Sequence, residues 1–423
     1  MYQQLTYGQQ LKALSDRAEK KIAEMHKLAD DHIDQNQYRV LKSFQNNRVS
    51  DSHFNPTTGY GYDDMGRDTL EKVYAEVFGG EAGLVRPQII SGTHAIALSL
   101  FGILRPGDEL LYITGKPYDT LEEIVGIRGS GNGSLKEYNI GYRTIDLTGE
   151  GRVDFEAVKQ AISSKTKMIG IQRSKGYAAR PSFTIEDIRE MIAFVKQIKP
   201  DVVVFVDNCY GEFVELQEPC HVGADLMAGS LIKNPGGGLA KTGGYIVGKQ
   251  EYVEAVSYRL TSPGIGAEAG ASLYSLQEMY QGFFMAPHIV GQAIKGAQFT
   301  SAILEEIGLN TFPKWNEKRT DLIQAVQFDN PDLMVTFCQA IQYASPINSH
   351  VTPYPNYMPG YEDDVIMAAG TFIQGASIEL TADGPLRPPY IAYVQGGLTY
   401  SHVKVAVLTA LNSLLEQKHI ALA

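Results

Sequence analysis

The twelve residues 202–213, VVVFVDNCYGEF, decide the fold. The first five are apolar and mostly β-branched, a composition typical of a strand that is buried on both faces of a parallel sheet. Asp207 follows directly and stands at the carboxyl end of this strand, the edge at which open α/β sheets bind their ligands. A carboxylate at a buried position is costly unless a cation faces it. The stretch therefore predicts a core strand, a ligand-binding edge and a cation opposite Asp207.

Outward from this strand, apolar runs alternate with helical stretches from residue 69 to residue 242. Runs rich in β-branched and aromatic residues predict strands, and the 3.6-residue periodicity between them predicts helices. The expected strands are 84–90, 109–113, 143–146, 168–171, 202–206 and 226–228, and the expected helices are 95–104, 121–127, 155–162 and 185–198. Strands that alternate with helices imply an α/β fold with a parallel or mostly parallel sheet.

The flanking segments have other patterns. Apolar residues at helical spacing between Leu11 and Ile33 predict an amphipathic N-terminal helix, and residues 264–306 are expected to be largely helical. Strands are then expected at 333–340, 376–380 and 392–395 and a last helix at 401–415, which indicates a smaller α+β domain. The predicted division is an N-terminal helical segment 1–49, a large domain 50–285 and a small C-terminal domain 286–423.

Composition excludes several classes of protein. The formal net charge of -11 argues against a surface for nucleic acid or anionic membranes. The three cysteines are scattered without CxxC spacing, so neither a disulfide framework nor a metal site is expected. The N-terminus lacks the apolar core of a secretory signal, and no apolar run approaches the roughly 20 residues of a membrane helix. We expect a soluble cytoplasmic protein.

A second motif follows the decisive strand at 223–237, GADLMAGSLIKNPGG. Ser230 and Lys233 lie three residues apart in the turn after an apolar run, just as Tyr210 lies three residues after Asp207. Taken alone, the pattern also fits a simpler interpretation, in which Asp207 caps a strand end and Lys233 is a solvated turn residue.

The order Asp-x-x-Tyr, then Ser-x-x-Lys, resembles the fold-type I enzymes that use pyridoxal 5'-phosphate (PLP), the aspartate-aminotransferase fold. The resemblance implies a seven-stranded, mainly parallel sheet in the large domain. It further implies that Asp207 pairs with the pyridinium nitrogen and that Lys233 forms the Schiff base. In the same comparison Tyr210 touches the phenolic oxygen and Ser230 binds the phosphate.

The run Ser91-Gly92-Thr93-His94 separates a predicted strand from a predicted helix. Small residues at this point let backbone N–H groups approach a phosphate, and the helix N-terminus adds positive potential. Ser91, Gly92 and Thr93 are therefore candidate phosphate-binding residues. An ordinary N-cap is the alternative.

Five strings, HFNPTTGYGYDD (53–64), SGTHAI (91–96), PYDTLEE (117–123), IQRSKGY (171–177) and GSLIKNPGGG (229–238), resemble a bacterial group related to methionine gamma-lyase and to cystathionine beta-lyases linked to aluminium resistance. The resemblance implies that Tyr118 stacks on the PLP ring and assists proton transfer. It also implies that the loop with Tyr60, Tyr62 and Arg67 reaches the phosphate of a neighbouring subunit. Two departures mark a divergent member: the lyases have a tighter Tyr-x-Arg spacing, and they have Thr where this chain has Ile232.

An amino-acid substrate needs a bidentate cation for its α-carboxylate, most often arginine. Arg173 and Arg387 are the candidates, and each could equally be a surface or interface residue. The partners that the resemblance implies are a small amino-acid substrate and further copies of the chain, in a homodimer or homotetramer with shared active sites.

The expected function is a PLP-dependent carbon–sulfur lyase that converts a sulfur-containing amino acid to a keto acid, ammonia and a thiol by β- or γ-elimination. PLP enzymes of one fold share their first steps and differ in the bond that is broken. An aminotransferase or aldolase of the same fold, and a non-catalytic protein that keeps only the fold, therefore stay open as alternatives.

Overall fold

The computed structural model describes residues 1–178, 180–358 and 361–420. Backbone contacts divide the chain into two compact units, residues 36–285 and residues 1–35 together with 286–423. Helices α1 (Gly8–Asn46) and α8 (Leu276–Glu306) each contribute to both units. The first 35 residues thus belong with the C-terminal ones, whereas the sequence predicts a separate segment 1–49.

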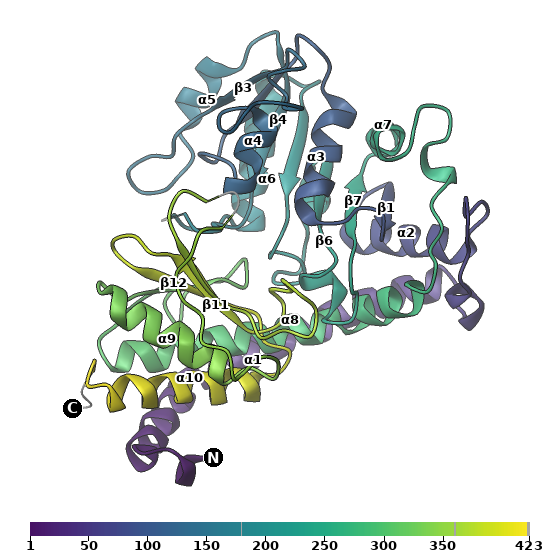
Figure 1. Cartoon of the computed structure of the whole chain (residues 1–423). Helices are drawn as coiled ribbons and strands as arrows, with labels where there is room; N and C mark the ends of the chain where they lie inside the picture. The colour runs from purple at the N-terminus through teal and green to yellow at the C-terminus, as the bar shows by residue number, and fades with distance from the viewer. Residues whose placement is uncertain (179, 359–360, 421–423) are drawn as a thin grey trace. The chain divides into compact units, whose positions relative to one another are not determined.

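The unit 36–285 contains one seven-stranded sheet with the order β1-β7-β6-β5-β4-β2-β3. Its strands are β1 (Ala82–Arg86), β2 (Glu109–Tyr112), β3 (Gly141–Thr144), β4 (Thr166–Gln172), β5 (Val203–Asp207), β6 (Leu226–Ser230) and β7 (Gly244–Gly248). Only β7, among the strands of this sheet that the structure describes, runs against the others (Figure 1). The predicted α/β fold with a seven-stranded, mainly parallel sheet is confirmed.

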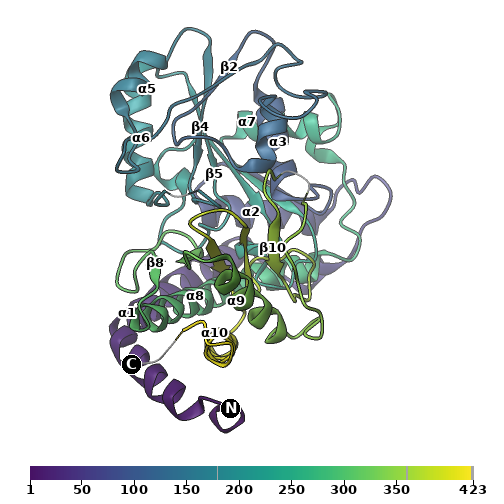
Figure 2. The ribbon, with the colours of Figure 1, turned by 60° about the vertical axis from the view of Figure 1, so that its left-hand side comes forward.

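The helices of this unit cover both faces of the sheet. They are α2 (Met65–Phe78), α3 (Gly92–Ile103), α4 (Glu122–Val125), α5 (Phe155–Ala161), α6 (Ile185–Ile198) and α7 (Gln250–Leu260). Apolar residues of α3 and α7 share one buried cluster with β1, β2, β5, β6 and β7. The helices α5 and α6 lie on the opposite face from α3 (Figure 2). At Gly102 a Cβ atom would lie 2.8 Å from Cα of Val256, so only glycine allows α3 and α7 to pack so closely.

Two local differences from the predicted elements have simple causes. The expected strand 84–90 ends at Arg86, because Pro87 has no N–H for the sheet and the chain turns there, with the Ile89 N–H donating to the Arg86 carbonyl at 3.3 Å. Strand β7 was not predicted, because only three residues separate the glycines at its two ends.

The register of the parallel strands decides which residues meet at the carboxyl edge. Gln172 at the end of β4 pairs with Asp207 at the end of β5, and Asp207 pairs with Ala228 of β6. Ser230 ends β6, and Lys233 follows in the next turn. The polar ends of three neighbouring strands are thereby brought to one edge of the sheet.

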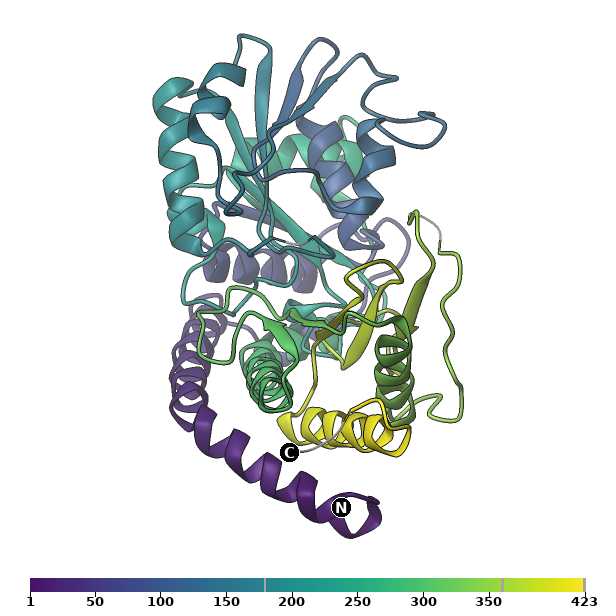
Figure 3. The ribbon, with the colours of Figure 1, turned by 90° about the vertical axis from the view of Figure 1, so that its left-hand side faces the viewer.

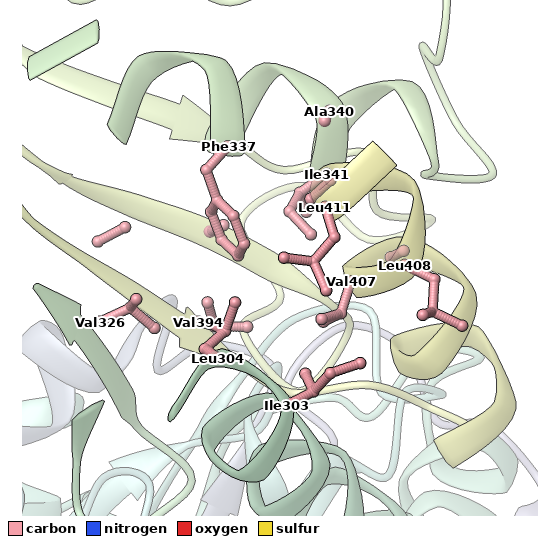
Figure 4. Close-up of a cluster of buried hydrophobic side chains, with 14 of the residues drawn as sticks. Ile303, Leu304, Val326, Phe337, Ala340, Ile341, Val394, Val407, Leu408 and Leu411 are labelled. Carbon is pink, nitrogen blue, oxygen red and sulfur yellow. The ribbon is translucent and has the colours of Figure 1, made fainter. Parts of the chain in front are cut away.

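The unit of residues 1–35 and 286–423 contains a five-stranded antiparallel sheet with the order β10-β11-β12-β9-β8. Its strands are β8 (Asn310–Phe312), β9 (Gln324–Gln327), β10 (Val365–Ala368), β11 (Thr381–Pro385) and β12 (Ile391–Gln395), and its helices include α9 (Pro331–Tyr343) and α10 (Tyr400–Glu416). Figure 3 shows α9 and α10 side by side. Figure 4 shows their side chains Phe337, Ile341 and Leu411 meeting Val394 of β12 in a buried core.

The predictions for this unit are correct in part. The strand at 392–395 lies in β12 and the last helix in α10. The strand predicted at 333–340 is wrong, since these residues form α9: the side chain of Asn330 accepts hydrogen bonds from the N–H groups of Asp332 and Leu333, and Pro331 occupies the first turn. The strand predicted at 376–380 is also wrong, because β11 begins only at Thr381. None of the described helices is both long and apolar enough to cross a membrane.

Candidate active site

A pocket with about 430 Å³ of space, part of it open to solvent, lies at the carboxyl edge of the seven-stranded sheet. The lining residues all belong to the unit 36–285 and are Thr93, Ile96, Tyr118, Thr120, Leu121, Gln172, Ser174, Gly176, Asp207, Cys209, Tyr210 and Lys233. Five residues that the sequence predicts for the site therefore line one pocket: Thr93, Tyr118, Asp207, Tyr210 and Lys233.

Asp207 is the acidic group of the pocket and is only 5% exposed. Burial raises the pKa of its carboxyl group, while the charge of Lys233 and the hydrogen bond from the backbone N–H of Cys209, at 3.1 Å, act in the opposite direction. The charge of Lys233 and this hydrogen bond therefore offset only part of the effect of burial on the carboxyl group. A cation entering the pocket would find it poorly neutralised.

Lys233 supplies the amine. Its Nζ lies 3.9 Å from the centroid of the Tyr210 ring. Burial lowers the pKa of Lys233, but neighbouring acidic groups, Asp207 among them, outweigh this effect, and the net shift is upward. The raised pKa favours the ammonium form of Lys233, so the amine must lose a proton before it reacts.

The turn after β5 holds Tyr210 in an unusual backbone conformation. Tyr210 has a φ of 72°, in the left-handed region that side chains other than glycine rarely adopt. The next residue, Gly211, lies so close to a buried arginine that a Cβ atom would be 2.5 Å from Nη1 of Arg173. Strain of this kind persists where the surrounding structure enforces it, and it often marks a functional site.

The first turn of α3 forms the second wall. The Ser91 side chain accepts a hydrogen bond from the His94 N–H at 3.0 Å, so this hydroxyl is the N-cap that was the alternative to a phosphate ligand. Gly92 lies against the end of β6, since a Cβ atom there would be 3.2 Å from Cβ of Ser230. The structure thus brings Gly92, Thr93 and Ser230 to one corner, where the helix N-terminus leaves backbone N–H groups for an anion.

Tyr118 comes from the loop after β2 and is half-buried. Its ring packs on the backbone of Gly176, where a Cβ atom would lie 2.9 Å from the ring. Gly176 itself has a φ of 55°, which glycine adopts without strain. The main chain therefore fixes the plane of the Tyr118 ring at the pocket wall.

Gln172 is a site residue that the sequence analysis missed. It is 5% exposed, and its Nε2 donates to the carbonyl of Ser174 at 2.8 Å. This bond fixes the orientation of the amide, and Oε1 has no hydrogen-bond partner among the residues that the structure describes. A signal was present, since Gln172 is a polar residue that ends an apolar strand, as Asp207 does.

Arg173 lies away from the pocket walls, so the structure gives no support to its predicted role in substrate binding. Its side chain is fully buried and does not line the pocket. Nη1 contacts Oδ1 of Asn208 at 2.8 Å and Oε2 of Glu218 at 3.2 Å, and Nη2 lies 3.4 Å from Oε1 of Glu215. Two carboxylates of the same chain already neutralise the guanidinium, so its role is structural.

This role makes Arg173→Met strongly destabilising. Two buried carboxylates would lose this cation, with the more distant Arg39 left at 3.7 Å from Glu218, and the loss costs roughly 3–5 kcal/mol of unfolding free energy. Arg387→Met is the matched control, because the Arg387 guanidinium is exposed and pairs with Asp363 at 2.9 Å. The loss of such an exposed ion pair should cost less than about 1 kcal/mol. Urea denaturation of both variants measures the difference, and equal losses would contradict the structural role of Arg173.

The remaining predicted residues lie outside the pocket walls. Arg67 is 2% exposed and donates to the carbonyls of Gly61, at 2.6 Å, and Gly270, at 3.1 Å. Its guanidinium thus contacts backbone of its own chain, and the prediction that Arg67 reaches a phosphate of a neighbouring subunit stays a prediction. Tyr60 and Tyr62 are exposed and stack on each other with ring centroids 5.4 Å apart. Their role, and that of Arg387, stays a prediction.

The chain resembles known proteins over nearly its whole length. The protein YnbB of Bacillus subtilis (strain 168), which is uncharacterized, is 69% identical over 421 residues, 99% of this chain and 100% of that protein. A crystal structure of a Listeria monocytogenes protein, provisionally assigned as a cystathionine beta-lyase involved in aluminium resistance, is 67% identical with a TM-score of 0.94 and covers 95% of this chain and 99% of that one.

A more distant structure concerns the fold alone. The pyridoxal-5'-phosphate-dependent protein YhfS of Escherichia coli is 17% identical with a TM-score of 0.61, over 90% of this chain and 96% of that one. The seven-stranded sheet and the smaller antiparallel sheet are thus those of fold-type I PLP enzymes. The family model for methionine gamma-lyase matches residues 11–415. The chain belongs to the methionine gamma-lyase family.

Proposed function

We propose that this protein is a PLP-dependent carbon–sulfur lyase that cleaves a sulfur-containing amino acid by β- or γ-elimination. The observation that carries the proposal is that Asp207 and Lys233, an acid and an amine, line one pocket at the carboxyl edge of the sheet. Membership of the methionine gamma-lyase family and likeness to the Listeria protein support the same reaction class.

The residues present fit the cofactor. The corner of Gly92, Thr93 and Ser230 offers backbone N–H groups and hydroxyls to the phosphate, with no side chain at position 92 to obstruct it. Asp207 would hold the pyridine nitrogen, since its poorly neutralised carboxylate requires a cation. Lys233 would hold the aldehyde carbon. PLP, when bound, supplies a ring that withdraws electrons from the α-carbon of the substrate.

The chain's own groups would then move the protons. Lys233 would be the base: its Nζ would take the α-proton of the substrate and could return a proton to another carbon. Asp207 keeps its negative charge against the ring nitrogen because the Cys209 N–H stabilises the carboxylate. Tyr118, held against Gly176, lines the same pocket and would relay a proton at Oη.

The reaction class is tested by product analysis. The protein with PLP is incubated separately with cystathionine, cysteine and methionine, and keto acid, ammonia and thiol are measured. Release of all three without an added keto acid supports the lyase. Product formation that requires a keto-acid acceptor would favour the aminotransferase, and aldehyde plus glycine from a β-hydroxy amino acid would favour the aldolase. Protein that takes up no PLP would favour the non-catalytic alternative.

Tyr118→Phe is expected to lower kcat by roughly 10²-fold, the low end for loss of one acid–base group, while KM changes little. The ring and its packing on Gly176 are retained, so only the hydroxyl is removed. Steady-state kinetics on the best substrate measure both constants. Tyr177→Phe is the matched control. The ring centroid of Tyr177 lies 6.2 Å from that of Tyr118, but Tyr177 does not line the pocket. A Tyr118→Phe enzyme with unchanged kcat would remove this residue from the proton relay.

We also propose an oligomer with an even number of subunits and shared active sites. Tyr60 is 71% exposed and Tyr274 is 83% exposed. Their loops are joined by a hydrogen bond from the Gly270 N–H to the Tyr60 carbonyl, at 2.8 Å. Together with Tyr62 and Leu273 they expose an aromatic surface, a feature of protein interfaces.

A complementation experiment tests the sharing of sites. Subunits with Lys233→Ala and subunits with Tyr60→Ala and Tyr62→Ala are each expected to be nearly inactive. If the tyrosines serve the neighbouring subunit, random hybrids regain about a quarter of the wild-type activity, since half of the dimers are hybrids with one intact site. No recovery in hybrids that are shown to form would contradict the sharing, and light scattering gives the number of subunits.

A further inference from the structure

Glu212 is a buried acid that the proposed reaction does not use. It lies in the turn segment after β5 and is 0% exposed. The hydroxyl of Tyr245, in β7, donates to its Oε1 at 2.7 Å. Its carboxyl group lies against the backbone of β6, because a Cβ atom at Gly229 would be 2.6 Å from Oε1. The other oxygen, Oε2, has no hydrogen-bond partner in the part of the chain that the structure describes.

The nearby cation is already committed elsewhere. Arg173 pairs with Glu215 and Glu218, and Arg39 adds a second contact to Glu218 at 3.7 Å. Asn208 connects this cluster to Tyr245, donating to Oε2 of Glu218 at 3.0 Å and to the Tyr245 hydroxyl at 3.3 Å. Within the described residues no ion pair reaches the Glu212 carboxyl group.

A buried carboxylate without a cation is unstable relative to the neutral acid. Burial raises the pKa of Glu212 to about 8, although the Tyr245 hydrogen bond and the charge of Lys233 lower it. The titratable and charged groups around Glu212 come from several elements, and they are Tyr74, Arg173, Cys209, Glu218, Lys233 and Tyr245. Among these groups, the charge of Lys233 lowers the pKa of Glu212 and the charge of Glu218 raises it.

Two features connect Glu212 to Lys233. Asn234 directly follows the lysine, and its Nδ2 donates to the Glu212 backbone carbonyl at 2.9 Å. The Oδ1 of Asn234 is, like Oε2 of Glu212, a buried acceptor with no hydrogen-bond partner in the described chain. If the Glu212 carboxyl group carries a proton on Oε2, this oxygen becomes a hydrogen-bond donor. In addition, Glu212 and Lys233 each shift the pKa of the other through their charges.

We propose that Glu212 is a positioning residue for Lys233: its backbone carbonyl holds the Lys233–Asn234 turn, and its side chain is a neutral carboxylic acid at neutral pH whose ionisation in alkaline solution stabilises the ammonium form of the lysine. The role of Lys233 as the PLP-binding amine rests on the proposed function. The ionisation releases one proton to solvent and leaves one negative charge on the Glu212 carboxylate, next to Gly229 of β6. That charge then opposes the loss of a proton from Nζ.

The test uses the apoprotein and measures the rate at which PLP is captured as a chromophore that borohydride reduces. Only the neutral amine reacts, so the rate reports the protonation of Lys233. Glu212→Gln keeps the acceptor for Tyr245 but has no charge. At pH 9 we expect this variant to capture PLP several-fold to about tenfold faster than the wild type, and at pH 6.5 the two rates should agree. Glu251→Gln, at an exposed position in the first turn of α7, is the control and should match the wild type at both pH values.

Tyr245→Phe provides an independent variant. Without the hydrogen bond that lowers the pKa of Glu212, the carboxyl group ionises at higher pH. The pH at which the PLP-capture rate of Tyr245→Phe falls below that of Glu212→Gln should therefore be higher than for the wild type. A rate ratio that is the same at pH 6.5 and pH 9 would overturn the inference. If the wild-type protein captures no PLP at all, the proposed function fails instead.

Unfolding of the apoprotein gives a readout that needs no PLP. A carboxyl group whose pKa is raised from 4.5 to about 8 binds more protons in the folded than in the unfolded state between these values. Its contribution to stability is therefore present at low pH and falls as the pH rises through this window. The wild-type unfolding midpoint should fall relative to that of Glu212→Gln between pH 5 and pH 8. Parallel midpoints would show that Glu212 is already ionised at neutral pH, against the proposal.

Discussion

Lys233→Ala is expected to reduce turnover by about 10³- to 10⁴-fold or more and to abolish the chromophore that borohydride reduces. The reason is that one nitrogen serves both as the attachment point for PLP and as the base for the α-proton, and no other lysine lines the pocket in the described chain. Stopped assays of keto acid and the absorption spectrum after dialysis against PLP measure the two losses.

Lys241→Ala is the matched control. This lysine lies in the same glycine-rich segment, but its side chain is 71% exposed and pairs with Glu278. Its loss should leave both the spectrum and the turnover near the wild-type values. Normal turnover in a Lys233→Ala protein, after contamination by host enzymes has been excluded, would end the assignment of the base.

Asp207→Asn is the second large change, and we expect weaker PLP binding together with a fall in kcat of roughly 10²- to 10³-fold. The amide has nearly the same shape but cannot balance a positive ring nitrogen, and truncating one partner of a buried charge pair costs roughly 2–5 kcal/mol. Spectrophotometric titration gives the Kd for PLP, and assays at saturating PLP separate the loss of cofactor from the loss of rate.

Asp201→Asn tests whether the effect depends on position. Asp201 precedes β5, so it lies at the opposite end of the same strand, and its side chain is 75% exposed. This variant should bind PLP and turn over normally. If Asp207→Asn behaves as Asp201→Asn does, the carboxylate at 207 plays no part in holding the ring.

The central part of the fold could be predicted because each core strand is a short, nearly continuous apolar run. Asp207 and Lys233 were predictable for the same reason: each follows such a run directly, and carboxyl ends of parallel strands meet at one edge. The α3 turn was predictable from Ser91 and Gly92, although the sequence could not decide between N-cap and phosphate ligand. In the structure the Ser91 side chain is the N-cap, while the backbone around Gly92 remains available.

The errors have a different origin, since they depend on residues that are distant in the sequence. Arg173 resembles a substrate ligand until Glu215 and Glu218, more than forty residues later, enclose its guanidinium. The segment 333–340 is rich in residues that favour strands, and only the cap at Asn330 and Pro331 indicates a helix. Gln172 can be recognised as a site residue only from the strand register, which places it beside Asp207.

The absence of a side chain at Gly176 has a consequence for selectivity. Because the Tyr118 ring rests directly on the main chain, an added methyl group at 176 would push the ring from its place in the pocket wall. The lack of a side chain at position 176 therefore helps to set the size of the substrates that the pocket admits, although Gly176 takes no part in the reaction. Relatives of this protein with alanine or serine at the equivalent position should accept substrates with shorter side chains. The range of substrates accepted should change more than the turnover rate on the best substrate.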